Sequence, residues 1–297
     1  MSYVIETRNL SKKFPNKLAV NKVNIHVEKG DIYGLIGKNG AGKTTSMRMI
    51  LGTLFPSEGE ILLFGSEKLD VERKRIGSLI EAPGIYRGCS AFENMKRFSL
   101  LYGGTDEDIK NILEFVGLGN VGKKKAGQFS LGMKQRLGIA LALLGNPELL
   151  ILDEPINGLD PAGIKEIRDL IVKLNQEKGV TFLISSHLLD ELGKIATRYG
   201  IINNGELVDE ISAYELQERC KTCLIIGVDD IEKAQELLKK AKLLDSYQVS
   251  ENKIMVYSHL EDPSLFNEVL VKGGVKVNQL TFSANAFEEY FIERLGK

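Results

Sequence analysis

The sequence predicts an α/β protein: a core of mostly parallel strands with flanking helices, an antiparallel β subdomain, a helical subdomain and a small C-terminal α+β module. Three observations support this prediction. A short apolar run enters a glycine-rich loop and leaves it as a helical pattern within residues 34–50. Two later apolar runs, at residues 148–155 and 180–187, flank a helical pattern, which is typical of βαβ units. A new series of short strand and helix patterns begins near residue 215.

The composition limits the classes of protein that fit. A length of 297 residues suits one large or two modest domains. Basic and acidic residues are balanced, 39 against 40, so no overall field attracts nucleic acid and no nucleic-acid partner is expected. No apolar run approaches the roughly 18 residues of a membrane span, and the N-terminal segment lacks the apolar core of a signal peptide. We therefore expect a protein of the cytosol.

The N-terminal segment predicts the antiparallel β subdomain. Residues 3–27 alternate between apolar and polar side chains, and turn residues stand at Pro15, Asn16, Lys29 and Gly30. We expect these strands to form an antiparallel sheet beside the parallel core.

The glycine-rich loop has the pattern of the phosphate-binding loop of P-loop NTPases: Gly37, four residues, then Gly42, Lys43 and Thr44. Its glycines remove Cβ atoms that would keep backbone amides away from a polyphosphate, and the next helix adds N-terminal N–H groups. Lys43 can reach the β- and γ-phosphates, and the Thr44 hydroxyl can bind Mg²⁺. The alternative is a chance glycine-rich turn. The candidate nucleotide-binding residues here are Gly37, Lys38, Asn39, Gly40, Ala41, Gly42, Lys43, Thr44 and Thr45.

Residues from about 84 to 146 predict a helical subdomain inserted into the core. The best helical patterns lie at residues 91–103, 106–118 and 130–145. Parallel-sheet character returns with the strand patterns at 148–155 and 180–187, which an amphipathic helix at 162–179 connects.

The first of these strands ends in two carboxylates, Asp153 and Glu154. At the carboxyl end of a parallel strand, Asp153 would hold Mg²⁺, usually through a water. Glu154 would face the γ-phosphate and orient or deprotonate the attacking water. The alternative is that both acids only cap the strand as it turns before Pro155.

The C-terminal residues 215–297 predict a separate module, so residues 1–214 form the first expected domain. The patterns run in the order β-α-β-β-α-β, with a hairpin turn at Glu251 and Asn252, which suggests a ferredoxin-like fold. No catalytic constellation occurs in this module, and its expected role is regulation or dimer contact.

Cysteines and histidines give little indication of a metal centre. Cys220 and Cys223 form a lone Cys-x-x-Cys pair, without the second pair that a zinc site would use. A redox or metal role stays open beside ordinary reduced thiols. The histidines, at 26, 187 and 259, are too scattered for a metal cluster.

In their order along the chain, these motifs resemble the ATP-binding subunit of ABC transporters over nearly all of residues 1–220. The resemblance implies ATP and Mg²⁺ as cofactors. Residues 157–161, Asn-Gly-Leu-Asp-Pro, are similar to the family's D-loop, and His187 matches the switch histidine that contacts the γ-phosphate. Phe14 is similar in position to the aromatic residue that stacks on adenine, with an apolar strand residue as the alternative.

The signature segment departs from the family pattern. Where the family has Leu-Ser-Gly-Gly-Gln, this chain has Phe-Ser-Leu-Gly-Met at residues 129–133. Ser130 still suits a helix N-cap. Leu131 adds a side chain and Met133 removes an amide, so we expect a weaker contact with a second subunit. The resemblance implies that the residues contacting the nucleotide of the second subunit are Ser130, Leu131, Gly132 and Asp160.

A second departure is Glu81, which stands where the family usually has a glutamine that touches magnesium. A carboxylate should bind the metal more strongly and repel the γ-phosphate when no metal intervenes. The alternative is a solvated loop acid. The glutamate and the altered signature are together similar to the bacitracin and lantibiotic self-protection exporters.

The resemblance implies an ATPase that drives export of a drug or antimicrobial peptide through separate membrane permease subunits. Two copies, or paired ATPase subunits, would close face to face at the inner face of the cell membrane. Lys43, Glu154 and His187 would be the catalytic residues, and Thr44, Glu81 and Asp153 the metal ligands. Two alternatives remain: an ABC-type ATPase outside transport, and a regulatory module that only senses ATP.

Overall fold

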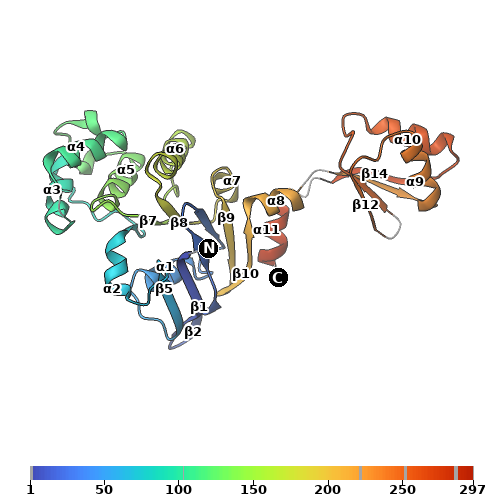
Figure 1. The fold of residues 1–297 in the computed structure, drawn as a ribbon. Coiled ribbons are helices and arrows are strands. Elements are labelled where there is room, and N and C mark those ends of the chain that lie inside the picture. The colour runs from blue at the N-terminus through green and yellow to red at the C-terminus, as the bar shows by residue number, and fades with distance from the viewer. Residues whose placement is uncertain (1–2, 103, 221–222, 251–252, 284–286, 297) are drawn as a thin grey trace. The chain divides into compact units, whose positions relative to one another are not determined.

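A computed structural model describes residues 3–102, 104–220, 223–250, 253–283 and 287–296 (Figure 1). The contacts divide the chain into two compact units. The first consists of Met1–Ala213 together with Phe291–Lys297, and the second of Tyr214–Tyr290. Among the described residues, no helix is both long and apolar enough to cross a membrane.

A six-stranded sheet forms the centre of the first unit, in the order β10-β9-β4-β8-β7-β6. Neighbouring strands are parallel except in the β9–β10 hairpin. The strands are β4 (Ile32–Ile36), β6 (Ile76–Leu79), β7 (Leu149–Asp153), β8 (Thr181–Ser186), β9 (Arg198–Asn203) and β10 (Glu206–Ser212). The helices that connect them include α1 (Lys43–Ile50), α6 (Pro161–Lys178) and α7 (Leu189–Leu192). The carboxyl ends of β4, β7 and β8 therefore meet at one edge of the sheet.

The helical subdomain lies between β6 and β7 in the chain. Its main helices are α3 (Ala91–Tyr102), α4 (Asp106–Phe115) and α5 (Leu131–Ala142). The shorter helices in and before it are α2 (Leu69–Glu72), η1 (Arg73–Arg75), η2 (Gly119–Val121) and η3 (Ala126–Gln128). Hydroxyl side chains cap the three main helices: Ser90 binds the backbone N–H of Glu93, Thr105 that of Asp108, and Ser130 that of Met133. These local caps explain why the helix starts could be predicted from the sequence.

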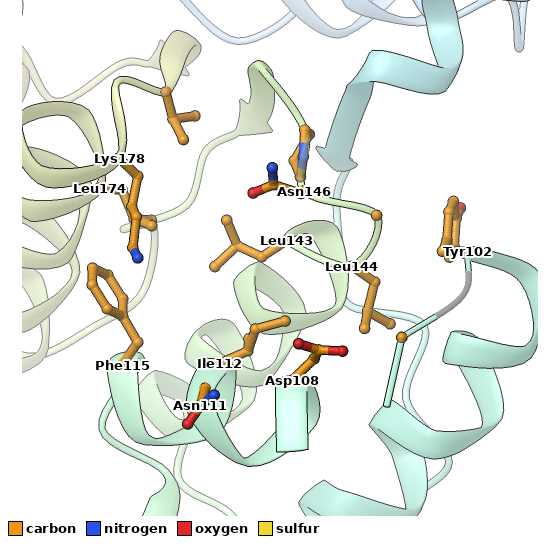
Figure 2. A pocket seen from close by; sticks show the side chains of 14 residues that line it. Tyr102, Asp108, Asn111, Ile112, Phe115, Leu143, Leu144, Asn146, Leu174 and Lys178 are labelled. Atoms are coloured by element: carbon orange, nitrogen blue, oxygen red, sulfur yellow. The ribbon is translucent and has the colours of Figure 1, made fainter. Parts of the chain in front are cut away.

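A cavity of about 490 Å³ lies where this subdomain meets the core (Figure 2). Phe115 from α4, Leu143 after α5 and Leu174 from α6 line it with apolar carbon. Polar side chains at its rim include those of Asp108 and Lys178. None of the predicted nucleotide-binding residues is part of this lining.

An antiparallel sheet packs beside the parallel one and shares its hydrophobic core. Its strands are β1 (Tyr3–Phe14), β2 (Lys17–Val23), β3 (His26–Glu28) and β5 (Glu58–Leu63), with β1 pairing with all three others. Ile5, Leu10 and Val27 from this sheet pack in one cluster with Leu35 and Leu149 from the parallel sheet. The predicted antiparallel subdomain is confirmed.

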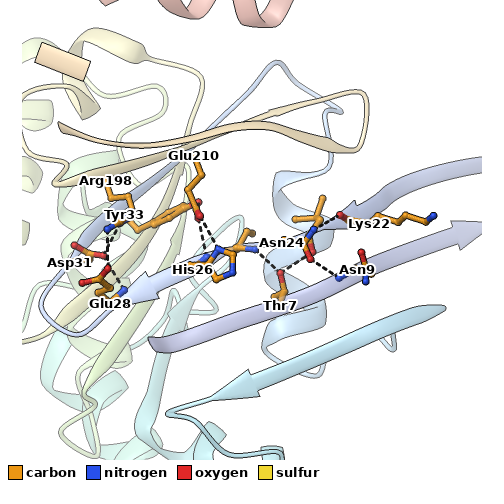
Figure 3. A network of polar contacts seen from close by, with 12 residues as sticks. Thr7, Asn9, Lys22, Asn24, His26, Glu28, Asp31, Tyr33, Arg198 and Glu210 are labelled. Carbon is orange, nitrogen blue, oxygen red and sulfur yellow. Dashed lines mark hydrogen bonds and ion pairs between the residues drawn. The ribbon is translucent and has the colours of Figure 1, made fainter. Parts of the chain in front are cut away.

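A polar network also joins the two sheets (Figure 3). Glu210 Oε1 on β10 accepts hydrogen bonds from Tyr33 Oη at 2.7 Å and from the backbone N–H of His26 at 2.9 Å. His26 Nδ1 lies 2.8 Å from Glu210 Oε2. Burial, together with the nearby Glu210 carboxylate, raises the pKa of the fully buried Tyr33 phenol well above its ordinary value. Its hydroxyl therefore stays a hydrogen-bond donor to the carboxylate at all ordinary pH values.

The second unit contains a four-stranded antiparallel sheet in the order β12-β13-β11-β14. Its elements are α8 (Ala213–Arg219), β11 (Cys223–Val228), α9 (Ile231–Lys240), β12 (Tyr247–Ser250), β13 (Lys253–Val256), α10 (Pro263–Lys272) and β14 (Val277–Ser283). Leu224, Ile226, Leu238 and Phe266 form its core. The order β-α-β-β-α-β and this strand order agree with the predicted ferredoxin-like module. The predicted turn at 251–252 lies outside the described residues.

The last helix, α11 (Phe287–Gly296), differs from the expected boundary. The sequence placed all of residues 215–297 in the C-terminal module, whereas Phe291–Lys297 belongs to the first unit. The physical reason is that Phe291 is fully buried against Tyr199 of β9, and Arg294 pairs with Asp209 of β10.

Candidate nucleotide-binding site

The glycine-rich loop connects the buried strand β4 to α1, as its pattern predicts. Gly42 has a φ of 113°, and a Cβ there would lie 2.8 Å from the carbonyl oxygen of Ala19. A Cβ on Gly37 would lie 2.4 Å from the carbonyl oxygen of Ile202. Both positions therefore require glycine, because neighbouring backbone fills the space that a side chain would occupy.

A cavity of about 330 Å³ opens beside this loop. Most of the loop residues predicted to bind nucleotide line it, and so do Phe14 and Glu154. Its full lining is Phe14, Lys17, Ala19, Lys38, Asn39, Gly40, Gly42, Lys43, Thr44, Thr45 and Glu154. Phe14 is 40% exposed, so its ring is accessible at the cavity rather than packed inside the sheet.

Lys43 is buried, and its ammonium group is held by the loop itself. Nζ donates to the carbonyl oxygens of Gly37 at 2.6 Å and Lys38 at 3.3 Å. It also lies 3.2 Å from Glu154 Oε1. The only carboxylate in this set of contacts is thus the proposed general base.

Asp153 lies at the end of β7 with two hydroxyl partners. Thr44 Oγ1 donates to Asp153 Oδ2 at 2.8 Å, and Ser185 Oγ donates to Oδ1 at 2.5 Å. The Asp153 side chain is almost completely buried. The described hydrogen-bond partners of this buried carboxylate are both hydroxyls, and a bound cation would add a positive charge beside it.

Glu154 and His187 contact each other at the ends of neighbouring strands. His187 Nδ1 lies 2.8 Å from Glu154 Oε2. A carboxylate oxygen accepts hydrogen bonds, so Nδ1 is the donor in this contact. The Glu154 backbone has a φ of 50°, and its N–H donates to Ser185 Oγ at 2.9 Å. Oε1 is buried and has no hydrogen bond of good geometry; its close neighbour is the Lys43 ammonium at 3.2 Å.

Glu81 lies apart from the other predicted metal ligands. Its Oε1 contacts Arg48 Nη2 at 2.7 Å, on the solvent side of α1. The side chain is 64% exposed and the backbone φ is 60°. Among the described residues, no hydrogen bond or ion pair joins Glu81 to Thr44 or Asp153, whereas Thr44 and Asp153 bond each other.

The residues predicted to act on a second subunit are not part of the cavity lining. Ser130 accepts from the N–H of Met133 at 3.2 Å and caps α5. Asp160 accepts from the N–H of Gly163 at 3.2 Å and caps α6. Leu131 is 45% exposed, and Gly132 follows it in the first turn of α5. Both caps are satisfied within the chain, while the Leu131 side chain is open to a partner.

Sequence reasoning missed three residues near the site. Ser185 bonds both Asp153 and the Glu154 backbone, and Lys17 Nζ lies 3.4 Å from the Gly40 carbonyl oxygen. Arg48 pairs with Glu81. The signal for Ser185 was its place at the end of a strand next to β7; the other two contacts depend on tertiary structure.

The described residues include no group of three or more His, Cys, Asp or Glu side chains that could hold a metal. Cys220 and Cys223 are free thiols. Burial raises the pKa of both thiols, which lowers the fraction of reactive thiolate. These features favour ordinary reduced thiols.

Comparisons with known proteins indicate the family of the chain. The family described as ABC transporter matches residues 20–157. The bacitracin transport ATP-binding protein BcrA of Enterococcus faecalis is 41% identical over 300 residues, which span 100% of this chain and 97% of that protein. The lantibiotic transport ATP-binding protein SrtF of Streptococcus pyogenes is 44% identical over 207 residues, covering 70% of this chain and 90% of that protein. The dimeric ATP-binding cassette MJ0796, solved in a post-hydrolysis state with ADP and Pi, has a TM-score of 0.62 and 25% identity, covering 70% of this chain and 98% of that one.

Proposed function

The chain belongs to the ATP-binding proteins of ABC transporters, and we propose that its ATP hydrolysis powers export of an antimicrobial peptide or drug through separate membrane subunits. The observation that carries the proposal is the grouping of Lys43, Asp153 and Glu154 around the phosphate-loop cavity. The transport names of BcrA and SrtF, for bacitracin and a lantibiotic, support this class of cargo. The proposed location is the inner face of the cell membrane, where such subunits would meet the ATPase.

ATP would bind along the phosphate loop, with its adenine on the Phe14 ring. Backbone N–H groups of the loop and of the first turn of α1 would donate to the phosphates. Lys43 would leave the carbonyl oxygens of Gly37 and Lys38 and turn to the β- and γ-phosphates. The Lys43 ammonium already lies inside the loop, so it would need to move only a short way to contact the phosphates.

The donor set at Asp153 suits Mg²⁺. This ion favours oxygen ligands, keeps several waters, and is usually bound by one or two carboxylates together with substrate phosphates. Thr44 Oγ1 and Asp153 Oδ2 are such oxygens, and Ser185 orients the carboxylate from its other side. When bound, the ion would neutralise charge on the phosphates. Glu81 could join this set only after leaving Arg48.

Glu154 is the proposed general base. His187, which contacts Glu154, is proposed to contact the γ-phosphate. Once Lys43 has turned to the phosphates, Glu154 Oε1 would be free to receive a hydrogen bond from the attacking water. His187 would hold the other carboxylate oxygen through Nδ1–H, and as an imidazolium it would also donate Nε2–H to the γ-phosphate. The closed state would pair two copies, each presenting Ser130 and Leu131 to the other's nucleotide, as the dimeric cassette MJ0796 illustrates for pairing.

Replacing the base tests this mechanism. Glu154→Gln should lower steady-state ATP turnover about 10²- to 10⁴-fold while leaving ATP binding intact, because the amide is isosteric but cannot accept a proton. The exposed Glu177 on α6 offers a matched control, since Glu177→Gln makes the same chemical change away from the site. Unchanged turnover in Glu154→Gln would remove Glu154 from the mechanism. Wild-type ATP binding without turnover would instead support the regulatory module that senses ATP.

The export proposal needs a cellular test. A strain lacking this gene should become more sensitive to a peptide antibiotic such as bacitracin, and the wild-type gene should restore resistance. The gene carrying Glu154→Gln should fail to restore it. Equal sensitivity of all strains across peptide antibiotics would favour an ABC-type ATPase outside transport.

A further inference from the structure

The end of α11 is anchored on the edge of the parallel sheet. Phe291 has no exposed surface, and its ring meets that of Tyr199 at 5.9 Å in an edge-on arrangement. Arg294 Nε lies 3.1 Å from Asp209 Oδ2. The first contact is on β9 and the second on β10, so the helix is fixed to two neighbouring strands.

These anchors bring the last turn of α11 to the phosphate loop. The carbonyl oxygen of Leu295 accepts from Lys38 Nζ at 3.1 Å and from Asn203 Nδ2 at 3.4 Å. Lys38 is the second residue of the loop, and Asn203 ends β9. The contact is possible because β4 and β9 are parallel, with Ile36 opposite Ile201, so the loop and the end of β9 leave the sheet together.

The chemistry of this contact favours a lysine. The last carbonyls of a helix lack intrahelical partners and carry the negative end of the helix dipole. An ammonium group satisfies such a carbonyl and is attracted by the dipole. The Lys38 side chain is exposed on its other sides, so this carbonyl is what gives it a defined direction.

The β9–β10 turn supports the same loop through its backbone. The N–H of Gly205 donates to the Ala41 carbonyl oxygen at 2.9 Å, and Ile202 lies against Gly37. The β9–β10 turn therefore already contacts the phosphate loop, and the end of α11 adds a further contact to the loop, at Lys38.

We propose that residues 291–296 of α11 position the phosphate loop for ATP by holding Lys38. The segment acts on nucleotide affinity, because a loop already held in one conformation loses less conformational freedom when the polyphosphate binds. The second unit, residues 214–290, precedes this segment directly in the chain. A displacement of α11 passed along the chain from that unit would reach the contact with Lys38 through Phe291 and Arg294.

The test is a set of substitutions in the full-length protein, with ATP affinity measured by titration calorimetry and KM and kcat from steady-state hydrolysis. Arg294→Ala should weaken ATP binding about threefold to tenfold with little change in kcat, since one charge-assisted contact between α11 and β10 is lost. Arg294→Lys should restore most of the affinity. Lys38→Met should weaken binding to a similar degree, and the double variant Lys38→Met with Arg294→Ala should be no weaker than Lys38→Met alone.

Lys272→Met is the control, because this exposed lysine belongs to α10 of the second unit and pairs with Glu268. A role limited to stability would give a different pattern: unchanged KM, a lower kcat from a smaller active fraction, and a lower melting temperature. That pattern, or affinity losses that simply add in the double variant, would overturn the proposal. Removing residues 291–297 gives a second, larger test with the same expected split between KM and kcat.

Discussion

At the scale of single residues, the pairing of Glu81 with Arg48 changes how the unusual glutamate is understood. A carboxylate near the phosphates would repel them in the absence of a cation. Arg48 supplies a permanent positive charge at 2.7 Å, and it belongs to α1, the helix that begins with Lys43. A glutamate in place of a glutamine is therefore accompanied by its own counter-ion.

This compensation predicts a coupling between the two residues. Arg48→Ala should weaken ATP binding in Mg²⁺-free buffer about twofold to fivefold, the size expected for an exposed ion pair. The same substitution should have almost no effect in a Glu81→Gln background, where no carboxylate is left to neutralise. Fluorescence titrations of all four proteins with an ATP analogue would measure the coupling. Equal effects of Arg48→Ala in both backgrounds would show that the ion pair is unrelated to nucleotide binding.

At the scale of elements, the helical subdomain depends on caps that the sequence encodes locally. Before α3, the Ser90 backbone donates to Glu93 Oε2 at 2.6 Å, and Ser90 Oγ accepts from the Glu93 N–H at 3.2 Å. Hydrogen bonds from Ser90 and then the Lys125 ammonium lower the pKa of Glu93 from 4.5 to about 2. The charged carboxylate is thus the form that favours the helix start.

The sign of the pH effect follows. A carboxyl whose pKa is lower in the folded protein stabilises it above the unfolded pKa, and this stabilisation is lost as the pH falls toward the folded pKa. Wild type should be more stable than Glu93→Gln at pH 7, and the difference should shrink between pH 4.5 and about 2. Urea unfolding curves at several pH values would measure it, with Glu177→Gln as control. A difference that is constant with pH would contradict the role of the charge.

The same scale shows what could be predicted from the sequence and what could not. Strand and helix patterns are local, so the βαβ units and the capped helices could be predicted from them. The phosphate loop could be predicted from the spacing of Gly37 and Lys43. The partner surface of an amphipathic helix is not local. The sequence predicted α11, but only tertiary packing places Phe291 on Tyr199 and assigns this end of the helix to the first unit.

The site residues also include some that a local pattern predicts and some whose contacts depend on tertiary structure. Asp153 and Glu154 stand at a strand end, and a parallel sheet necessarily brings such ends to one edge. Arg48 and Glu81 are 33 residues apart and belong to no repeating pattern, so their contact could not be predicted. Residues defined by strand position were predictable, whereas side-chain pairs between separate loops and helices were not.

At the scale of the whole molecule, we propose that the signature segment influences how readily two copies pair. Leu131 is 45% exposed and lies near the turn at Gly158. Its side chain adds to the surface at a position where the family's signature has glycine. The Ser130 cap of α5 is nevertheless intact. We expect pairing to persist with reduced affinity.

Pairing predicts a particular dependence of rate on concentration. ATP turnover per mole of protein should rise with protein concentration, because only paired copies complete each site. Leu131→Gly should shift this rise to lower concentration, since it removes the additional side chain. Steady-state assays over a wide range of protein concentrations would test both statements. A specific activity independent of concentration would contradict self-pairing of the isolated chain.

The three contacts of Lys43 have a consequence for the order of events in one turnover. In the structure, the lysine ammonium contacts Glu154 and two loop carbonyls at once. In the proposed mechanism Lys43 turns to the phosphates, so binding of the nucleotide would itself release the glutamate. The carboxylate would then become available to a water only when there is a γ-phosphate for that water to attack. Movement of the Lys43 ammonium from the Glu154 carboxylate to the phosphates would thus make the base available at the moment the substrate is bound. This step would need no larger movement of the chain.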